Sequence, residues 1–208
     1  MTYRNCCSQV SPSTHGSQGW RSTKSLMICW SVVMVCSLVL QTIAFAQQSD
    51  PNEYQVKATY LYNFGKYVKW PGTFPASKRD SFPVCVFGQD PFGAILDSTL
   101  AGETLDGKPV VLRRISKPQD AMECRILFIS SSEEKHLKEI LAALDSNGIL
   151  TVSDMPGFTR RGGMIQFLLE GDKVRFEVNL ASAENSKLVL SSELLKVAAS
   201  IRNGRSGD

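Results

Sequence analysis

Residues 125–153, RILFISSSEEKHLKEILAALDSNGILTVS, decide the fold of this chain. The stretch opens on a short apolar run, Arg125–Ser130, which is typical of a buried strand. Apolar residues then recur at helical spacing: Leu137, Ile140, Leu141 and Leu144. Asn147-Gly148 ends that helix, because glycine tolerates left-handed dihedrals, and Ile149–Ser153 is a second strand-like run. The pattern therefore predicts a β-α-β unit with two parallel strands.

The serines between the first strand and the helix are best explained as helix caps. Ser131 and Glu134 have the spacing of a capping box, in which each side chain satisfies a backbone N–H at the start of a helix. The run Ser130-Ser131-Ser132 also resembles a nucleophile patch. Its position between a strand and a helix favours capping over catalysis.

The residues before this unit continue the alternation of strands and helices. Phe82–Gly88 is a short apolar run that predicts a buried strand, and Lys108–Ile115 predicts another. Asp90 as a cap and Pro91 at the first helical position predict a short helix that reaches about Leu100. Gly102–Gly107 is expected to be a loop.

An aromatic helix is predicted upstream, over Glu53–Trp70, and Pro71-Gly72 is expected to end it. Its broad apolar face has five members: Tyr60, Leu61, Phe64, Tyr67 and Val68. Such a face usually packs on a sheet. A platform on which a ligand stacks is the alternative interpretation.

The chain after residue 162 changes character. Gly163–Glu170 and Lys173–Asn179 flank the turn Gly171-Asp172 and predict an antiparallel hairpin. Two helical stretches follow, around Ala181–Lys187 and Ser192–Ile201. We therefore expect an α/β fold, a single layered domain with a mixed, partly parallel sheet flanked by helices and a C-terminal β-hairpin.

The N-terminal segment, residues 1–46, has the features of a secretory signal peptide. Arg21 and Lys24 precede the apolar run Leu26–Leu40, and Ala44-Phe45-Ala46 is a small-x-small cleavage pattern. An uncleaved membrane anchor is the alternative, because the apolar stretch is near the lower length limit for spanning a bilayer. Cleavage would export residues 47–208 as one α/β domain to the periplasm.

The exported part differs in charge and cysteine content from the whole chain, because the signal peptide, residues 1–46, contains basic residues and cysteines. Of the 23 basic residues, Arg4, Arg21 and Lys24 precede residue 47, as do four of the six cysteines and none of the 20 acidic residues. The exported part is therefore near neutral, which gives no indication of a nucleic-acid partner. It retains Cys85 and Cys124, which we expect to pair in an oxidising compartment, two reduced buried cysteines being the alternative.

Residue patterns for catalysis are scarce. No clustered His, Cys or acidic residues have metal-ligand spacing, so neither a metal nor a cofactor is expected. His136 is expected on the polar side of a charged helix, and no pattern pairs it with a nucleophile. The loop Gly157–Gly163 is glycine-rich and basic but matches no phosphate-binding motif. Its Arg160 and Arg161 are candidates for binding an anion or the acidic face of a partner.

Several segments together resemble the YfiR family, in the expected order and over nearly all of residues 47–208. The segments are Tyr54–Ala58, Leu61–Phe64, Lys66–Val68, Trp70-Pro71, Cys85–Gly88, Asp90–Gly93, Cys124–Ser130, Leu150–Asp154, Gly157-Phe158, Gly162–Ile165 and Val174–Asn179. The resemblance implies a periplasmic α/β regulator without enzymatic activity, which inhibits an inner-membrane diguanylate cyclase by binding its periplasmic sensor domain. It also allows a homodimer, which no pattern in the sequence requires.

The resemblance further implies roles for individual residues. Cys85 and Cys124 match one family cysteine pair, whereas Thr159 and Gln166 stand where some relatives carry a second pair. A second bridge is therefore not expected, which argues against tight redox control. Glu177 and Ile165 match positions at the partner interface of such relatives. Ordinary hairpin positions, Ile165 in the core and Glu177 on the solvated face, are the alternative.

Three functional hypotheses follow from these observations. The leading one is a non-enzymatic regulator that binds a membrane signalling protein, either a diguanylate cyclase or a sensor kinase, through its periplasmic domain. The second is a periplasmic small-molecule-binding accessory protein of a sensor kinase or receptor, using the aromatic helix or the Arg160–Arg161 loop. The third is an exported enzyme with an unusual site, which the missing nucleophile–base pair disfavours.

Overall fold

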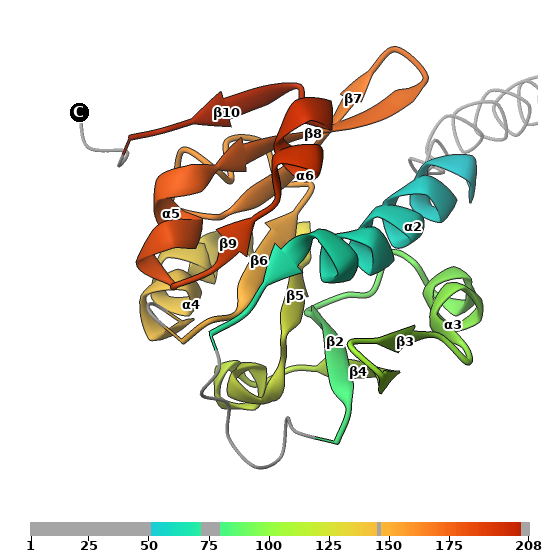
Figure 1. The fold of residues 1–208 in the computed structure, drawn as a ribbon. Helices are drawn as coiled ribbons and strands as arrows, with labels where there is room; N and C mark the ends of the chain where they lie inside the picture. The colour runs from blue at the N-terminus through green and yellow to red at the C-terminus, as the bar shows by residue number, and fades with distance from the viewer. Residues whose placement is uncertain (1–50, 72–79, 145–146, 205–208) are drawn as a thin grey trace, which may run out of the picture. The chain divides into compact units, whose positions relative to one another are not determined.

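A mixed β-sheet with helices on both faces forms the body of the fold in Figure 1. The computed structural model describes residues 51–71, 80–144 and 147–204. The predicted signal peptide, residues 1–46, lies outside the described residues. Among the residues described, no helix has both the length and the apolar character needed to cross a bilayer.

The strands are short, and the helices are of unequal length. The strands are β1 (Val68–Lys69), β2 (Phe82–Phe87), β3 (Thr104–Leu105), β4 (Lys108–Ile115), β5 (Ile126–Ile129), β6 (Leu150–Ser153), β7 (Ile165–Glu170), β8 (Lys173–Asn179), β9 (Val189–Leu190) and β10 (Ser200–Arg202). The α-helices are α2 (Pro51–Tyr67), α3 (Ala94–Leu100), α4 (Leu137–Leu144), α5 (Leu180–Asn185) and α6 (Ser192–Val197), and the 3₁₀ helices are η3 (Pro118–Glu123) and η4 (Ser131–His136).

The strand order of the main sheet is β10-β8-β7-β6-β5-β2-β4-β3. The pairs from β4 through β2, β5 and β6 to β7 are parallel, and β8 is antiparallel to β7. At the two ends, β10 runs parallel to β8 and β3 antiparallel to β4. The predicted fold class, a partly parallel sheet with a hairpin towards one side, is therefore confirmed.

Each face of the sheet has its own apolar core. On one face, Leu61 and Phe64 of α2 pack with residues such as Phe176 of β8. On the other face, α4 packs through Leu137 and Ile140 on β2 and β5. This second core contains Cys85 and Cys124, which form a disulfide that ties the end of η3 to β2.

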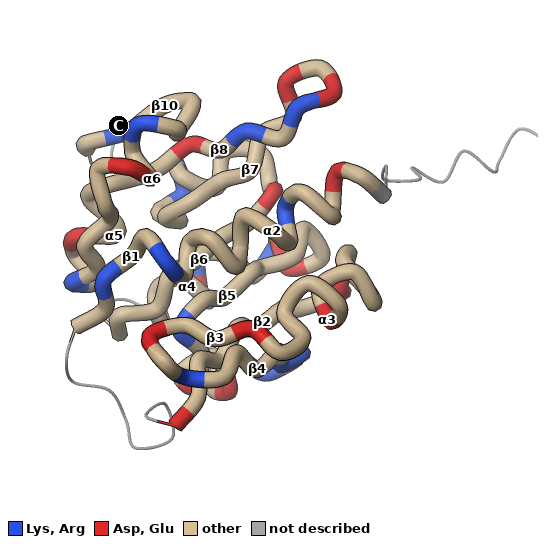
Figure 2. Tube along the Cα trace, turned by 45° about the vertical axis from the view of Figure 1, so that its right-hand side comes forward, with Lys and Arg blue, Asp and Glu red and all other residues tan. Residues whose placement is uncertain are grey.

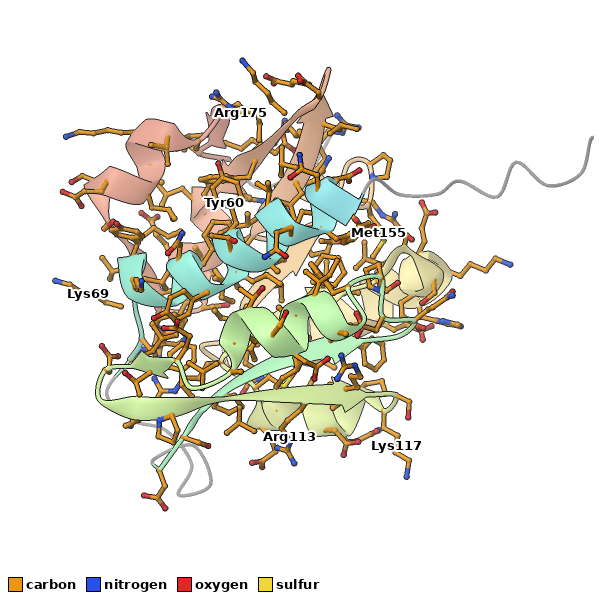
Figure 3. All side chains as sticks on the ribbon, turned by 90° about the vertical axis from the view of Figure 1, so that its right-hand side faces the viewer. Tyr60, Lys69, Arg113, Lys117, Met155 and Arg175 are labelled. Carbon is orange, nitrogen blue, oxygen red and sulfur yellow. A yellow bond between two sulfur atoms is a disulfide. The ribbon has the colours of Figure 1, made fainter. Side chains whose placement is uncertain are left out.

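Tyr60 and Phe64 of α2 pack against the sheet, whereas Tyr67, which was predicted on the same apolar face, is 43% exposed. The ring of Tyr60, labelled in Figure 3, stacks on Phe64 and meets Phe176 edge-on at a centroid distance of 5.4 Å. Phe64 in turn stacks on Phe167, with centroids 5.9 Å apart. These rings pack in the core, where such pairs add to the stabilisation from burial. They therefore form no platform on which a ligand could stack.

Two helix ends differ from the prediction because of distant pairing. The first helix stops at Tyr67 rather than Trp70, since Val68 pairs with Leu190 and Lys69 with Val189 in a two-stranded sheet. The last helix stops at Val197 rather than Ile201. Residues Ser200–Arg202 instead pair with β8, an arrangement that the apolar spacing of a helix does not predict.

Local details around two other helices also correct the prediction. Asp90 accepts a hydrogen bond from the Phe92 amide in a turn, and the helix starts only at Ala94. The predicted loop Gly102–Gly107 contains the short strand β3. Ser130 rather than Ser131 caps the segment after β5, because its hydroxyl accepts from the Ser132 amide at 3.3 Å and a 3₁₀ turn precedes α4.

Candidate partner-binding surface

A row of four polar side chains crosses one end of the sheet. Ser153 of β6 pairs in register with Gln166 of β7, Gln166 with Glu177 of β8, and Glu177 with Ser200 of β10. The neighbouring residues in these strands, among them Ile165, belong to the core beneath α2. Because side chains alternate along a strand, the polar row lies on the opposite face of the sheet.

Glu177 is the centre of this row. Its carboxylate accepts hydrogen bonds from the Thr159 hydroxyl and, at 3.3 Å, from the Ser200 hydroxyl. The Asn179 amide donates to the Thr159 carbonyl at 2.8 Å. Glu177 thus connects the loop after β6 to both β8 and β10. The network lies on the same face of the sheet as α4, which packs over β2 and β5.

Gln166, next to Glu177, is only 5% exposed. Within the described part of the chain its Oε1 has no hydrogen-bond partner. Thr159 and Gln166 were predicted to stand at the positions of a second cysteine pair in some relatives, and both lie beside Glu177. The structure therefore brings together three of the residues that the sequence singled out.

Ile165 and Glu177, the two predicted interface residues, lie on opposite faces of the hairpin. Ile165 is fully buried in the core beneath α2, whereas Glu177 is partly exposed. Ile165 therefore offers a partner no surface in this structure, because strand alternation turns it inward. Of the two, Glu177 is the one accessible to a partner.

The two arginines of the basic loop have different surroundings. Arg161 forms an ion pair with Glu134 at 3.1 Å and also donates to the Glu134 carbonyl at 2.9 Å. It therefore holds the loop against η4. Arg160 is exposed, and its guanidinium lies against Gly157. Arg160 follows Thr159 and is the freer of the two to meet an anion.

A buried charge cluster fixes the start of α2 to the end of β6. The ammonium of Lys57, which is buried, lies 2.5 Å from Glu53 and 2.7 Å from Asp154. The Tyr54 hydroxyl donates to Asp154 at 3.0 Å. Burial, and then the charge of Asp154, raise the pKa of the Tyr54 phenol well above its usual range. Every charge in the cluster has a partner, as buried charges require, so its role is structural.

The disulfide lies away from the polar row. Cys85 and Cys124 are fully buried, with their Cα atoms 5.9 Å apart. A buried bridge is poorly accessible to reductant in the folded state.

The polar side chains around η4 have contacts with one another in the described part of the chain. Ser132 donates to Glu133 at 3.2 Å, and Nδ1 of His136 lies 3.6 Å from the same carboxylate. Among the described residues His136 is bonded to no serine hydroxyl, so these groups lack the nucleophile–base contact of a catalytic triad. The described ranges also contain no group of three or more His, Cys, Asp or Glu able to hold a metal ion.

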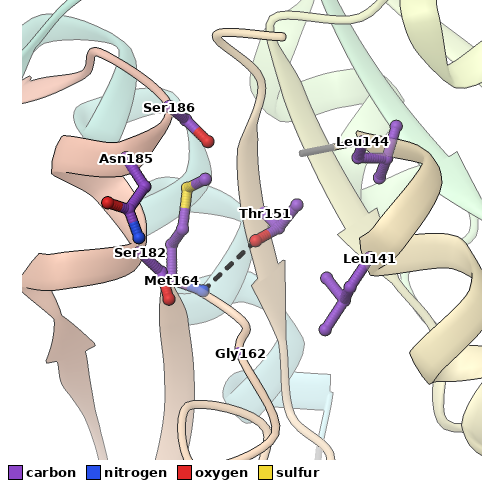
Figure 4. A pocket seen from close by; sticks show the side chains of 8 residues that line it. All are labelled: Leu141, Leu144, Thr151, Gly162, Met164, Ser182, Asn185 and Ser186. Atoms are coloured by element: carbon purple, nitrogen blue, oxygen red, sulfur yellow. Dashed lines mark hydrogen bonds between the residues drawn. The ribbon is translucent and has the colours of Figure 1, made fainter. Parts of the chain in front are cut away.

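A small pocket between α4 and α5 is shown in Figure 4. Leu141 and Leu144 line one side and Ser182 and Asn185 the other, over a floor where Thr151 accepts a hydrogen bond from the Met164 amide. Its volume of about 60 Å³ is well below the several hundred Å³ of usual ligand sites. A second pocket, between the start of α2 and the hairpin tip, is about 130 Å³. Neither supports a drug-sized ligand.

Comparison with known proteins identifies the family. The model of the YfiR/HmsC-like family matches residues 54–199, well over half of the 208-residue chain. The chain belongs to the YfiR/HmsC-like family. Membership in the YfiR/HmsC-like family supports a periplasmic regulatory role, and it agrees with the resemblance seen in the sequence.

Two solved structures match part of the chain at a distance. A conserved domain protein from Vibrio cholerae O1 biovar eltor has a TM-score of 0.46 at 11% identity, over 58% of this chain and 54% of that one. An ABC domain from Streptococcus pneumonia in complex with L-Trp has a TM-score of 0.41 at 8% identity, over 58% and 55%. The chain thus spans about half the length of each, and at these TM-scores neither carries an argument about function.

Proposed function

We propose that this protein is a periplasmic, non-enzymatic regulator that binds the periplasmic sensor part of an inner-membrane diguanylate cyclase and inhibits it. The observation that carries the proposal is the YfiR/HmsC-like family match over residues 54–199. That match covers both cores and three of the four residues of the polar row, Ser153, Gln166 and Glu177. The proposal also includes export through a cleaved leader, residues 1–46.

The physical basis would be a shift in the population of the partner's conformations. A regulator that binds the inactive state of a membrane protein more tightly than the active state stabilises the inactive state by the difference in binding free energy. A tenfold difference in affinity corresponds to about 1.4 kcal/mol. A rigid sheet face suits this task, because it loses little conformational entropy on binding.

The face that carries Glu177 is our candidate for the contact with the cyclase. The loop after β6 contacts this face through Thr159, and the exposed Arg160 of the same loop lies at its border. The charge balance supports a protein partner over a nucleic acid. In Figure 2 acidic and basic positions are interleaved along the β7–β8 hairpin, so no continuous basic stripe is present there.

The proposal is tested by deleting the gene and measuring intracellular cyclic di-GMP. We expect the level to rise, and to return when the full-length protein is supplied again. A variant that lacks residues 1–46, and therefore stays in the cytoplasm, serves as the control and should not restore the level. An unchanged level in the deletion strain would contradict inhibition of a cyclase.

A further inference from the structure

Two arginines lie on the same face of the sheet as Glu177. Arg175 precedes Glu177 by two residues in β8, so its side chain is on the same side of the sheet. Arg202 of β10 pairs in register with Asn179, two positions beyond the pair formed by Ser200 and Glu177. The polar face of β8 and β10 therefore carries two guanidinium groups, one on each strand.

Arg175 and Arg202 are both partly buried, and neither guanidinium group has an anionic partner among the described residues. In the described ranges no carboxylate lies within ion-pair distance of Arg175 or Arg202. Nε of Arg175 is buried and has no hydrogen-bond partner in the same ranges. The carboxylate of Glu177 instead accepts hydrogen bonds from the hydroxyl groups of Thr159 and Ser200. A partly desolvated guanidinium is stabilised by a carboxylate that it can bind through two N–H groups.

The strand that carries Arg202 is an edge of the sheet. β10 is the last strand in the order, and its neighbour is β8. Apolar side chains are exposed on its α6 side, where Ile201 is 42% exposed and Val197 of α6 is 57% exposed. An edge strand offers backbone N–H and C=O groups that pair with another extended chain. This edge thus combines open backbone groups, an apolar side and a basic side.

We propose that the β10 edge binds an extended segment of the partner protein in which acidic residues alternate with apolar ones. This inference rests on the proposed function and names the chemistry of the partner. The segment would extend the sheet as a strand beside β10. Its acidic side chains would face Arg202 and Arg175, and its apolar side chains would pack on Ile201, since cross-strand pairs meet on the same face.

The charges around the site favour a protein segment over an anionic membrane. Glu177 lies on the same face as the two arginines, and Glu170 and Asp172 are at the tip of the β7–β8 hairpin. These carboxylates would repel a surface of anionic lipids. A single strand can place its carboxylates beside the arginines and avoid the acidic positions.

The test uses the protein purified after export from cells that express the full chain. The probe is a fluorescein-labelled seven-residue peptide of alternating valine and glutamate, and the control peptide has lysine in place of glutamate. Binding is measured by fluorescence anisotropy at two salt concentrations. We expect the glutamate peptide to bind at least about tenfold more tightly than the lysine peptide, and more weakly at high salt.

Three variants make the assignment specific. The double variant Arg175→Gln/Arg202→Gln should weaken binding at least about tenfold. Ile201→Ser, which keeps both arginines but removes the exposed apolar side chain on which the segment would pack, should also weaken it. Arg113→Gln is the matched control. Arg113 is exposed on β4, towards the opposite end of the sheet from Arg175 in Figure 3, and forms no ion pair with a described residue. It should leave binding unchanged.

Equal binding of the two peptides, or binding that the double variant does not weaken, would overturn the inference. So would arginine-dependent binding to phosphatidylglycerol vesicles without binding to the peptide. The assay contains no cyclase, so its failure leaves the proposed function standing. An unchanged cyclic di-GMP level in the deletion strain would remove the proposed function instead.

Discussion

The hydroxyl of Thr159 donates a hydrogen bond to Oε1 of Glu177, across 18 positions of sequence. This contact joins the loop after β6 to the polar face of β8. Glu177 also accepts from Ser200 of β10, so one carboxylate connects three segments of the chain. The hydrogen bond lies on the surface that we assign to partner binding, and its removal should lower the free energy of unfolding.

Replacing Thr159 with valine should lower the free energy of unfolding by about 1–2 kcal/mol, because a partly buried carboxylate then loses a hydrogen-bond donor. Urea denaturation measures the loss. Thr104→Val is the matched control, since Thr104 is exposed on β3 and its replacement should change the stability by less than about 0.5 kcal/mol. Equal stabilities of the two variants would show that the hydrogen bond from Thr159 to Glu177 does not stabilise the fold.

Replacing Lys57 with methionine should lower the free energy of unfolding by about 3 kcal/mol, because Glu53 and Asp154 would lose the cation between them. The two carboxylates retain some contact with water, which places the expected loss at the lower end of the range for broken buried pairs. Lys66→Met, at an exposed position of the same helix, should change the stability far less. A loss at Lys57 no larger than at Lys66 would refute the structural role of the cluster.

Reducing the disulfide between Cys85 and Cys124 should destabilise the fold by about 4 kcal/mol, because the bridge closes a loop of 39 positions. The exported protein should show no free thiol among these two cysteines when denatured without reductant, and two after reduction. Thiol titration gives the count, and denaturation with and without reductant gives the free energy. Two free thiols before reduction would contradict the pairing.

Replacing Arg114 with glutamine should raise the pKa of Asp97 towards its ordinary value. The Arg114 guanidinium donates to Asp97 at 2.5 Å and lowers the pKa of that carboxyl. A carboxyl with a depressed pKa contributes stability above the pKa of the unfolded chain, and this contribution is lost as the pH falls through the folded pKa. Titration of the carboxyl by NMR measures the shift. Arg113→Gln should leave the pKa of Asp97 unchanged, and an equal shift in both variants would contradict the pairing.

The central strands and the partly parallel character of the sheet could be predicted from local patterns, whereas the strand order could not. The apolar runs around Cys85, Leu127 and Val152, with a helical pattern between the last two, indicate parallel strands joined by crossovers. The turn Gly171-Asp172 indicates the hairpin in the same way. These signals are local, because burial and turn chemistry leave their mark on adjacent residues.

The chain ends and the candidate surface depend on pairing between distant residues. The spacing of Leu194, Leu195, Ala198 and Ile201 fits a helix, and only the register of Ile201 with Val178 makes the last residues a strand. The polar row also depends on distant pairing, because Gln166 and Ser200 meet Glu177 from separate strands. The sequence analysis did not single out Arg175 and Arg202, because only the pairing of β8 with β10 places them on one face. The alternation of Arg175, Glu177 and Asn179 with apolar residues in β8 was the signal that marked a second, polar face.

The most direct test of the central claim is the intracellular cyclic di-GMP level in the deletion strain. Inhibition of a diguanylate cyclase predicts a rise on deletion, a return to the original level with the full-length protein, and co-purification of the exported protein with that cyclase from detergent-solubilised membranes. An unchanged cyclic di-GMP level, with no membrane protein retained, would contradict the assignment.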